Sequence, residues 1–238
     1  MKVLLTRPEG RNQTMSTALS ERGTPHLVTP LLGVEATPPS RSTDDILSAD
    51  IIIFVSTNAV NFGTQALDQS WPAHIQYFAV GKATWESFAA AGISGVRAAD
   101  DNQQTEGLLE LDALQHVDGK KVVIVRGNGG RELLAQTLTS RGATVEFWEV
   151  YRRTCPDYDA AKVCREWQEF GIDTIVITSP DMLENLITLV PKELFPWLSA
   201  CHIIVPSSRA EAQAIARGLT HVTNAGAAHA EAMLAALK

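Results

Sequence analysis

The chain has 238 residues, of which 45% are hydrophobic and 20% are charged, which is typical of a globular protein large enough to bury its own core. Its formal net charge of -7 disfavours nucleic-acid binding, which needs a basic face, and no apolar run approaches the ~20 residues of a membrane span. Because the chain leads directly into a strand-like run and its 3 cysteines form no CxxC pair, we expect a cytoplasmic protein without a signal peptide, a disulfide framework or a zinc site.

Short apolar runs alternate with segments of helical composition along the whole chain. The runs are rich in Val and Ile, as in strands that are covered on both faces, and several of the helical segments end at a glycine suited to a C-terminal cap. This alternation predicts parallel sheets with helices on both faces. In chain order we expect strand Lys2–Thr6, helix Asn12–Arg22, strands His26–Leu31 and Ile51–Val55, helix Asn58–Leu67, strand Gln76–Val80, helices Thr84–Ala91 and Thr105–Gln115, strand Lys121–Arg126, helix Gly130–Arg141, strand Thr144–Tyr151, helix Tyr158–Phe170, strand Thr174–Thr178, helix Asp181–Leu189, strand His202–Val205, and helices Arg209–Arg217 and Ala228–Leu237.

The two halves of the chain also resemble each other. Residues 2–23 match residues 121–142 without a gap, including Arg7 against Arg126, and the segment DIIIFVS matches the later DTIVITS. A tandem duplication explains these matches, although any two strand–helix units share some likeness. Breaks rich in Pro and Ser lie at 36–43 and 154–157, so the enclosed block could form one domain and the chain ends the other. That division would require the first strand–helix units to be exchanged between the halves.

Small hydroxyl residues, glycines and basic residues follow the carboxyl ends of the predicted strands, where α/β sheets bind ligands. Free N–H groups at helix N-termini bind carboxylates or phosphates, and arginine pairs with carboxylates through two parallel hydrogen bonds. Serine and threonine there are equally explained as helix caps, and a single arginine as a solvated surface residue. The candidate substrate-binding residues are Arg7, Arg11, Ser56, Thr57, Asn58, Gly81, Lys82, Thr84, Arg126, Gly127, Arg131, Ser179, Ser207 and Ser208, with Arg209 as a further cation.

Familiar catalytic motifs are incomplete in this sequence. The run from Gly127 to Gly130 begins like a dinucleotide fingerprint, but Glu132 stands at its last glycine, and no Ser or Thr directly follows Lys82 as in a phosphate-binding loop. No GxSxG elbow, Cys/His pair or metal-ligand set is present. Tyr151 ends a strand beside the second break, where it could donate a proton or could simply pack beside a hinge.

Segments recur along the chain in the order LLTRPEGRN, IIFVSTNAV, FAVGKAT, VVIVRGNGGRELL, RGATVEFWEVYRR, IVITSPDMLENL and VPSSRAEAQAIARGL. Taken in this order, they resemble the uroporphyrinogen-III synthase family over essentially the whole chain. The resemblance implies two α/β domains with a cleft between them, joined by a two-stranded linker near 32–36 and 149–154. The first domain would comprise residues 1–34 plus 154–238, the second residues 35–153, and the linker would act as a hinge.

The same resemblance implies an enzyme that closes hydroxymethylbilane to uroporphyrinogen III, with loss of water and inversion of ring D. It implies no cofactor and no metal. It also suggests that hydroxymethylbilane synthase passes the substrate directly to this protein. Tyr151 matches the family's linker tyrosine, a candidate to protonate the departing hydroxyl. Ser56, Thr84, Ser179 and Ser208 would line the cleft, although Ser207 could stand in for Ser208.

Other interpretations remain open from the residues alone. A two-domain binding protein could close on a small polyanionic ligand without chemistry, although such proteins usually work in the periplasm. A sugar- or nucleotide-handling transferase is the third possibility, and the incomplete phosphate loop counts against it. The sequence has no heptad pattern or long exposed apolar stripe, so we expect a monomer.

Overall fold

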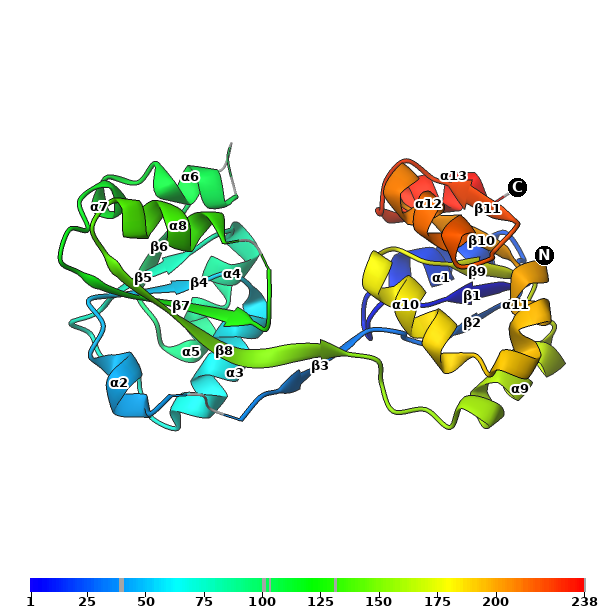
Figure 1. The fold of residues 1–238 in the computed structure, drawn as a ribbon, viewed down its shortest axis with the longest axis horizontal. Coiled ribbons are helices and arrows are strands. Elements are labelled where there is room, and N and C mark those ends of the chain that lie inside the picture. Colours follow the sequence, from blue (N-terminus) through cyan, green and yellow to red (C-terminus); the bar gives the residue numbers. More distant parts are fainter. Residues whose placement is uncertain (39–40, 100–101, 103, 131, 238) are drawn as a thin grey trace. The chain divides into compact units, whose positions relative to one another are not determined.

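The computed structural model describes residues 1–38, 41–99, 102, 104–130 and 132–237. The chain divides into two compact units (Figure 1). Unit 1 comprises Met1–Gly33 and Thr154–Lys238, and unit 2 comprises Val34–Arg153. Among the described residues, no helix is both long and apolar enough to cross a membrane.

Unit 1 is built on a five-stranded sheet in the order β11-β10-β9-β1-β2, and all of its pairs are parallel. Strands β9 and β1 of this sheet are wholly buried, because helices cover both of its faces. The strands are β1 (Val3–Leu5), β2 (His26–Val28), β9 (Thr174–Val176), β10 (His202–Val205) and β11 (Val222–Asn224), and the helices are α1 (Gln13–Glu21), α9 (Ala160–Phe170), α10 (Pro180–Leu189), the 3-10 turn η1 (Lys192–Leu194), α11 (Phe195–Ala200), α12 (Ser208–Ala216) and α13 (Ala230–Ala236).

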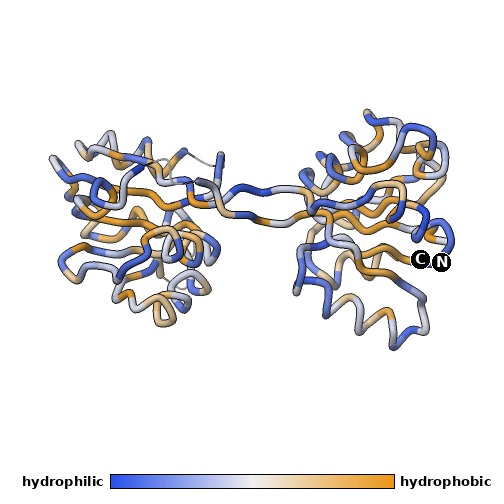
Figure 2. Tube along the Cα trace, turned by 90° about the horizontal axis from the view of Figure 1, so that it is seen from below, coloured by the Kyte–Doolittle hydropathy of each residue, from blue (hydrophilic) through white to orange (hydrophobic). Residues whose placement is uncertain are grey.

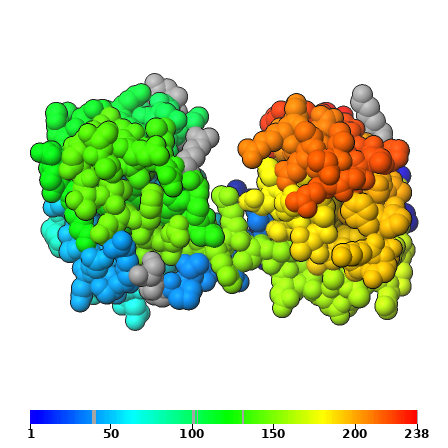
Figure 3. All heavy atoms as spheres, viewed as in Figure 1, coloured from blue at the N-terminus to red at the C-terminus, as the bar shows by residue number. Residues whose placement is uncertain are grey.

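Two apolar clusters form the core of unit 1, one on each face of the sheet. Leu4 points toward the cluster that also buries side chains of α9, α10, α11 and α12. Its neighbours Val3 and Leu5 point toward the opposite cluster, where Met15 of α1 and Met233 of α13 pack. This alternation is the two-residue period of a strand buried on both sides. In the space-filling view, α12 and α13 form part of the surface of unit 1 in orange and red (Figure 3).

Unit 2 contains a six-stranded sheet in the order β3-β8-β7-β4-β5-β6. Strands β4 to β8 pair in parallel, and β3 lies beside β8 at the edge where the chain enters and leaves the unit. The strands are β3 (Gly33–Ala36), β4 (Ile51–Phe54), β5 (Gln76–Ala79), β6 (Gly95–Arg97), β7 (Lys121–Gly127) and β8 (Thr144–Thr154), and the helices are α2 (Thr43–Leu47), α3 (Thr57–Leu67), α4 (Lys82–Glu86), α5 (Phe88–Ala91), α6 (Thr105–Leu109), α7 (Asp112–Gln115) and α8 (Leu133–Ser140).

The core of unit 2 is likewise divided by its sheet. Ile52 and Phe54 face the cluster that includes side chains of α2, α3 and α5, whereas Ile51 and Ile53 face α6, α7 and α8. The hydropathy-coloured trace shows the resulting hydrophobic stretches along the strands inside each unit (Figure 2). The predicted architecture of parallel sheets with helices on both faces is therefore confirmed.

The two sheets have the same spatial order but a different order along the chain. Sheet positions β11-β10-β9-β1-β2 correspond to β6-β5-β4-β7-β8. The matched segments of the sequence occupy equivalent places, because β1 and α1 correspond to β7 and α8, β4 to β9, and α6 to α13. The first strand–helix units are thus exchanged between the halves, and the repeat and the domain breaks are compatible.

Each predicted strand and helix overlaps an observed one, with differences at several ends. The segments Thr84–Ala91 and Thr105–Gln115, predicted as single helices, are each divided into two short helices. The glycines expected to end helices, among them Gly23, Gly92 and Gly171, have the positive φ of a left-handed C-terminal cap, which confirms that part of the prediction. Strands β6 and β11 and helices α2 and α11 were not predicted.

Candidate active site

In unit 1, the candidate binding residues lie at the carboxyl ends of β1, β9 and β10. The hydroxyl groups of Ser179 and Ser207 accept hydrogen bonds from the N–H groups of Met182 and Ala210, and so they cap α10 and α12. Ser208 is the first residue of α12, and its hydroxyl accepts from the amide of Asn224. Helix capping therefore accounts for Ser179 and Ser207.

Arg7 and Arg11 lie near the carboxyl end of β1 and differ in their surroundings. Arg7 is half-buried, its Nη2 donates a hydrogen bond to the carbonyl oxygen of Ala228, and burial lowers the pKa of its guanidinium below the ordinary value. Arg11 is exposed. Of the two, Arg7 is the cation that the fold holds in place.

In unit 2, the candidate residues lie at the carboxyl ends of β4, β5 and β7. Ser56 caps α3 by accepting from the N–H of Ala59, and Thr57 and Asn58 form the first turn of that helix. Gly81 is the N-cap of α4, and Thr84 is buried within the same helix. Lys82 is exposed, with its Nζ 3.7 Å from a carboxylate oxygen of Glu86. Arg131 lies outside the described residues.

A pocket of about 240 Å³ opens at this edge of the unit 2 sheet. It brings together Arg126, Gly127 and Tyr151 from the predicted set. Ser56, Gly81 and Lys82 lie at the N-termini of the neighbouring helices α3 and α4 and are not part of its lining. The complete lining is Val55, Val80, Thr105, Ile124, Arg126, Gly127, Asn128, Gly129, Gly130, Leu134, Phe147, Tyr151 and Arg153.

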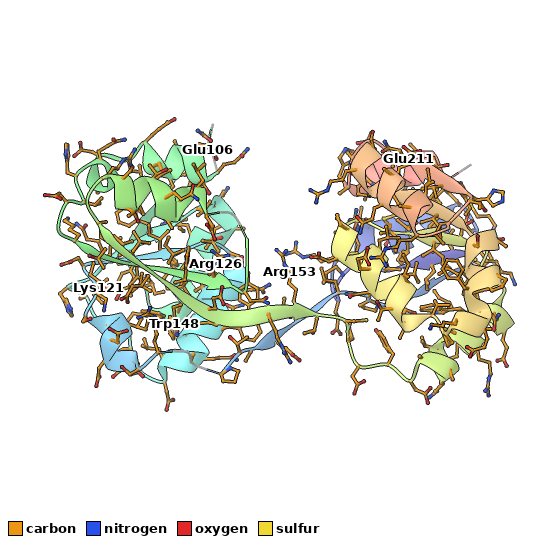
Figure 4. The ribbon with its side chains drawn as sticks, in the orientation of Figure 1. Glu106, Lys121, Arg126, Trp148, Arg153 and Glu211 are labelled. Atoms are coloured by element: carbon orange, nitrogen blue, oxygen red, sulfur yellow. The ribbon has the colours of Figure 1, made fainter. Side chains whose placement is uncertain are left out.

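Arg126 supplies a buried positive charge to this pocket. Its side chain is only 7% exposed, its Nε donates to the carbonyl oxygen of Gly127 over 3.1 Å, and its guanidinium lies over the ring of Phe147, 4.4 Å from the centroid. Figure 4 shows Arg126 at the end of β7. Glu149 approaches Nε only to 3.8 Å and is 42% exposed. Because a buried charge needs a close partner, this loose pairing suits the guanidinium to an incoming anion.

A β-bulge in β8 aims the tyrosine of the pocket. Arg126 is paired with Glu149, but Gly127 is paired with Tyr151, so Val150 is an extra residue in β8. Val150 and Tyr151 therefore both belong to one core cluster, whereas neighbouring residues of a regular strand point to opposite faces. Bulges of this kind redirect side chains beside functional sites.

The ring and hydroxyl of Tyr151 are held by neighbours from two elements. The ring stacks on Phe62 of α3, with centroids 5.7 Å apart and planes inclined by 27°. A Cβ at Gly127 would lie 2.5 Å from the Tyr151 ring, so only glycine leaves room for it. The hydroxyl lies 3.0 Å from Oγ of Ser56. The tyrosine is 6% exposed and lines the pocket.

The pocket thus combines a proton donor with a cation. A phenol hydroxyl can protonate a leaving group, and a buried guanidinium can hold a carboxylate in one orientation. Phe62 and Phe147 were not predicted from the sequence, because the sequence alone does not show which neighbours an aromatic side chain of a helix or strand meets. Among the described residues, no group of three or more His, Cys, Asp or Glu side chains could hold a metal ion.

Sequence comparisons identify relatives along the whole chain. The family model for uroporphyrinogen-III synthase HemD matches residues 13–235. The uroporphyrinogen-III synthase of Salmonella typhimurium is 35% identical over an alignment of 248 residues, and that of Escherichia coli is 34% identical over the same length, with each alignment covering 100% of both chains. A third synthase, from Proteus mirabilis, is 31% identical over 79% of this chain and 98% of its own.

Solved structures share the fold at low sequence identity. A uroporphyrinogen-III synthetase from Helicobacter pylori aligns with a TM-score of 0.61 at 15% identity, over 98% of this chain and 96% of that one. A mutant uroporphyrinogen III synthase from Thermus thermophilus aligns with a TM-score of 0.52, also at 15% identity, over 99% and 96% of the two chains. The match of the family model and the identity to the full-length relatives show that this chain belongs to the uroporphyrinogen-III synthase family.

Proposed function

We propose that this chain cyclises hydroxymethylbilane to uroporphyrinogen III, with loss of water and inversion of ring D, and thus acts as a lyase of tetrapyrrole biosynthesis. Membership of the family supports the reaction. The unit 2 pocket points to the residues involved, because Arg126 and Tyr151 both line it. The alternative of a non-catalytic binding protein gives no reason for a phenol and a cation in the lining of one pocket.

In the proposed reaction, Tyr151 protonates the hydroxyl group of the terminal hydroxymethyl substituent. The carbon–oxygen bond breaks, water leaves, and the nitrogen lone pair of ring A stabilises the resulting azafulvenium cation. Ring D then attacks the azafulvenium carbon through its substituted carbon to form a spiro intermediate. The bond from this carbon to the methylene of ring C breaks, the freed methylene bonds to the unsubstituted carbon of ring D, and the proton that this carbon loses returns to the Tyr151 phenolate. Because closure without an enzyme gives the uninverted isomer, the protein must hold both ends of the chain in one geometry.

Arg126 would hold one carboxylate of the substrate during these steps. Its guanidinium is fixed by the contacts with Phe147 and the Gly127 carbonyl, so little side-chain entropy is lost when a carboxylate binds. The remaining basic candidates from the sequence, Arg7, Arg11, Lys82 and Arg131, would bind further carboxylates of this substrate. Cofactor-free catalysis, a monomeric state, a cytoplasmic location and transfer of the substrate from hydroxymethylbilane synthase stay predictions from the sequence.

The product isomers test the proposed activity directly. Hydroxymethylbilane is generated in situ, the protein is added, and the oxidised products are separated by chromatography. We expect mainly isomer III with the protein and isomer I without it. If isomer I predominates in both reactions, the synthase activity is refuted and the binding protein becomes the better account.

A further inference from the structure

Ser56 was expected to bind substrate, but its contacts point to another role. Its Oγ accepts a hydrogen bond from the N–H of Ala59 over 3.1 Å and lies 3.0 Å from the hydroxyl of Tyr151. The same oxygen therefore joins the first turn of α3 to the tyrosine of the pocket. Ser56 itself is not among the residues that line the pocket.

The chemistry of the serine hydroxyl favours one direction for the bond to Tyr151. A hydroxyl carries one proton and two lone pairs, and the Ala59 N–H occupies one of those lone pairs. Donation from Ser56 to the tyrosine oxygen makes use of the serine proton, for which the described residues offer no other acceptor. Hydrogen bonds in such a chain strengthen one another.

The position of Ser56 at a helix N-terminus favours the same direction. Helix α3 has 11 residues, and the positive end of its dipole lies at Ser56. When Tyr151 gives up its proton, negative charge develops on its oxygen. A serine that donates to this oxygen, and that is itself polarised by the helix N-terminus, stabilises the charge.

We propose that Ser56 is a positioning residue whose hydroxyl donates to Tyr151 and leaves the tyrosine proton directed into the pocket. The stacking of Phe62 and the space beside Gly127 fix the ring, and Ser56 fixes the rotation of the hydroxyl. Ser179 caps the corresponding helix of unit 1, and no tyrosine in the described part of the chain donates to or accepts from its hydroxyl. This inference rests on the proposed function, because it assigns Ser56 to the proton donor of that reaction.

A double-mutant cycle tests the inference through activity. In the wild-type background, Ser56→Ala should lower kcat by roughly 3- to 10-fold with little change in KM, which is the range for one lost hydrogen bond. Ser56→Thr keeps the hydroxyl and the cap, and it should restore most of the rate. In the Tyr151→Phe background, Ser56→Ala should cause no further loss. Equal losses in both backgrounds, or no loss in either, would overturn the proposal.

Two further measurements separate this role from a structural one. Ser42→Ala removes an N-cap of α2 in the same unit, where the serine accepts from the N–H of Asp45, and it should lower stability without lowering kcat. A cycle of urea midpoints for Ser56→Ala and Tyr151→Phe should give a non-zero coupling, and a coupling of zero refutes the hydrogen bond. If the wild-type protein forms isomer I, the proposed function fails, and this stability cycle still tests the Ser56–Tyr151 contact.

Discussion

Arg126 places a largely buried positive charge in the lining of the unit 2 pocket. A side chain that is 7% exposed loses most of its hydration, and the carboxylate of Glu149 is held 3.8 Å from its Nε. Glu149 also accepts a hydrogen bond from the N–H of Gly129, which draws it toward the loop. The guanidinium consequently stays available to a substrate carboxylate.

Replacement of Arg126 should weaken substrate binding. Because a charged hydrogen bond contributes about 1.5–3 kcal/mol, Arg126→Gln should raise KM for hydroxymethylbilane by roughly 10- to 100-fold. Arg126→Lys keeps the charge but loses the planar guanidinium fork, so its KM should lie between those of the wild type and Arg126→Gln. Steady-state kinetics in the coupled assay would measure both. Arg217→Gln, which removes an arginine paired with Glu184 at the surface of unit 1, is the control and should leave KM unchanged. An unchanged KM for Arg126→Gln would contradict this role.

Gly127→Ala should displace the ring of Tyr151. The added methyl group would lie 2.5 Å from that ring, and overpacking of this kind costs about 1–3 kcal/mol of stability. We expect a lower Tm together with a loss of synthase activity, measured by thermal unfolding and by the isomer III rate. In Gly33→Ala the nearest atom is 3.6 Å from the added carbon, so that variant should be close to wild type in both measurements. Full activity of Gly127→Ala would show that the tyrosine is not held in this way.

Among the helices and strands, the sequence patterns predicted the fully buried strands and missed strands that are only partly buried. Strands such as β4 and β9 are apolar and buried on both faces, so they read clearly from the sequence. The edge strand β6 is a three-residue strand that begins with Gly95, and β11 contains Thr and Asn, so neither shows an apolar run. Helix α11 contains Pro196 in its first turn and is too short to show a helical period.

The site divides in the same way between what was predicted and what was not. The rule that ligands bind at the carboxyl ends of parallel strands predicted Arg126 and Gly127, and the resemblance to the family indicated the role of Tyr151. The bulge at Val150 and the stacking on Phe62 depend on register and packing between distant segments, which spacing along the chain does not encode. The serine caps were recognised as caps, but the additional contact of Ser56 with Tyr151 was not.

An ion-pair network fastens helix α2 to the sheet of unit 2. The hydrogen bond from Lys121 and then the one from Arg41 lower the pKa of the Asp45 carboxyl below its ordinary value. A carboxyl with a lowered folded-state pKa contributes stability above its unfolded pKa of about 4, and this contribution is lost as the pH falls through the folded value. The network therefore makes unit 2 sensitive to acid.

Asp45→Asn should reduce this acid sensitivity. At pH 7 the variant should be less stable than the wild type, because the ionised carboxylate no longer pairs with Lys121. Below pH 4 the difference in stability should shrink, because the wild-type carboxyl becomes protonated and is then as uncharged as the amide of the variant. Urea midpoints recorded from pH 7 to pH 3 would measure this, and parallel pH profiles for the two proteins would show that the ion pair does not respond to pH.

In the whole molecule, two sheets share one spatial order of strands, but the chain connects the strands differently in each sheet. Unit 2 is one continuous segment, Val34–Arg153, which contains its whole sheet apart from the first residue of β3 and the last residue of β8. Unit 1, in contrast, is formed from both ends of the chain. Each unit has its own apolar clusters on both sides of its sheet. We propose on this basis that each unit is a domain.

Two fragments of nearly equal length distinguish this division from the sequence repeat. Residues 34–153 contain nearly the whole unit 2 sheet and should unfold cooperatively in urea. Residues 1–119 form one copy of the repeat, but their strands belong to both sheets, so this fragment should not fold cooperatively. Circular dichroism during urea titration would compare them. Cooperative unfolding of residues 1–119 alone would contradict the division.

We propose that the hydroxyl of Tyr151, in the unit 2 pocket, protonates the departing group, and Tyr151→Phe removes that proton donor. Phenylalanine keeps the stacking on Phe62 and removes only the hydroxyl group. Because general acid catalysis contributes substantially to a rate and water in the pocket can replace it in part, the rate of isomer III formation should fall by about tenfold or more, with KM nearly unchanged. A variant that folds normally and forms isomer III at the wild-type rate would contradict the account.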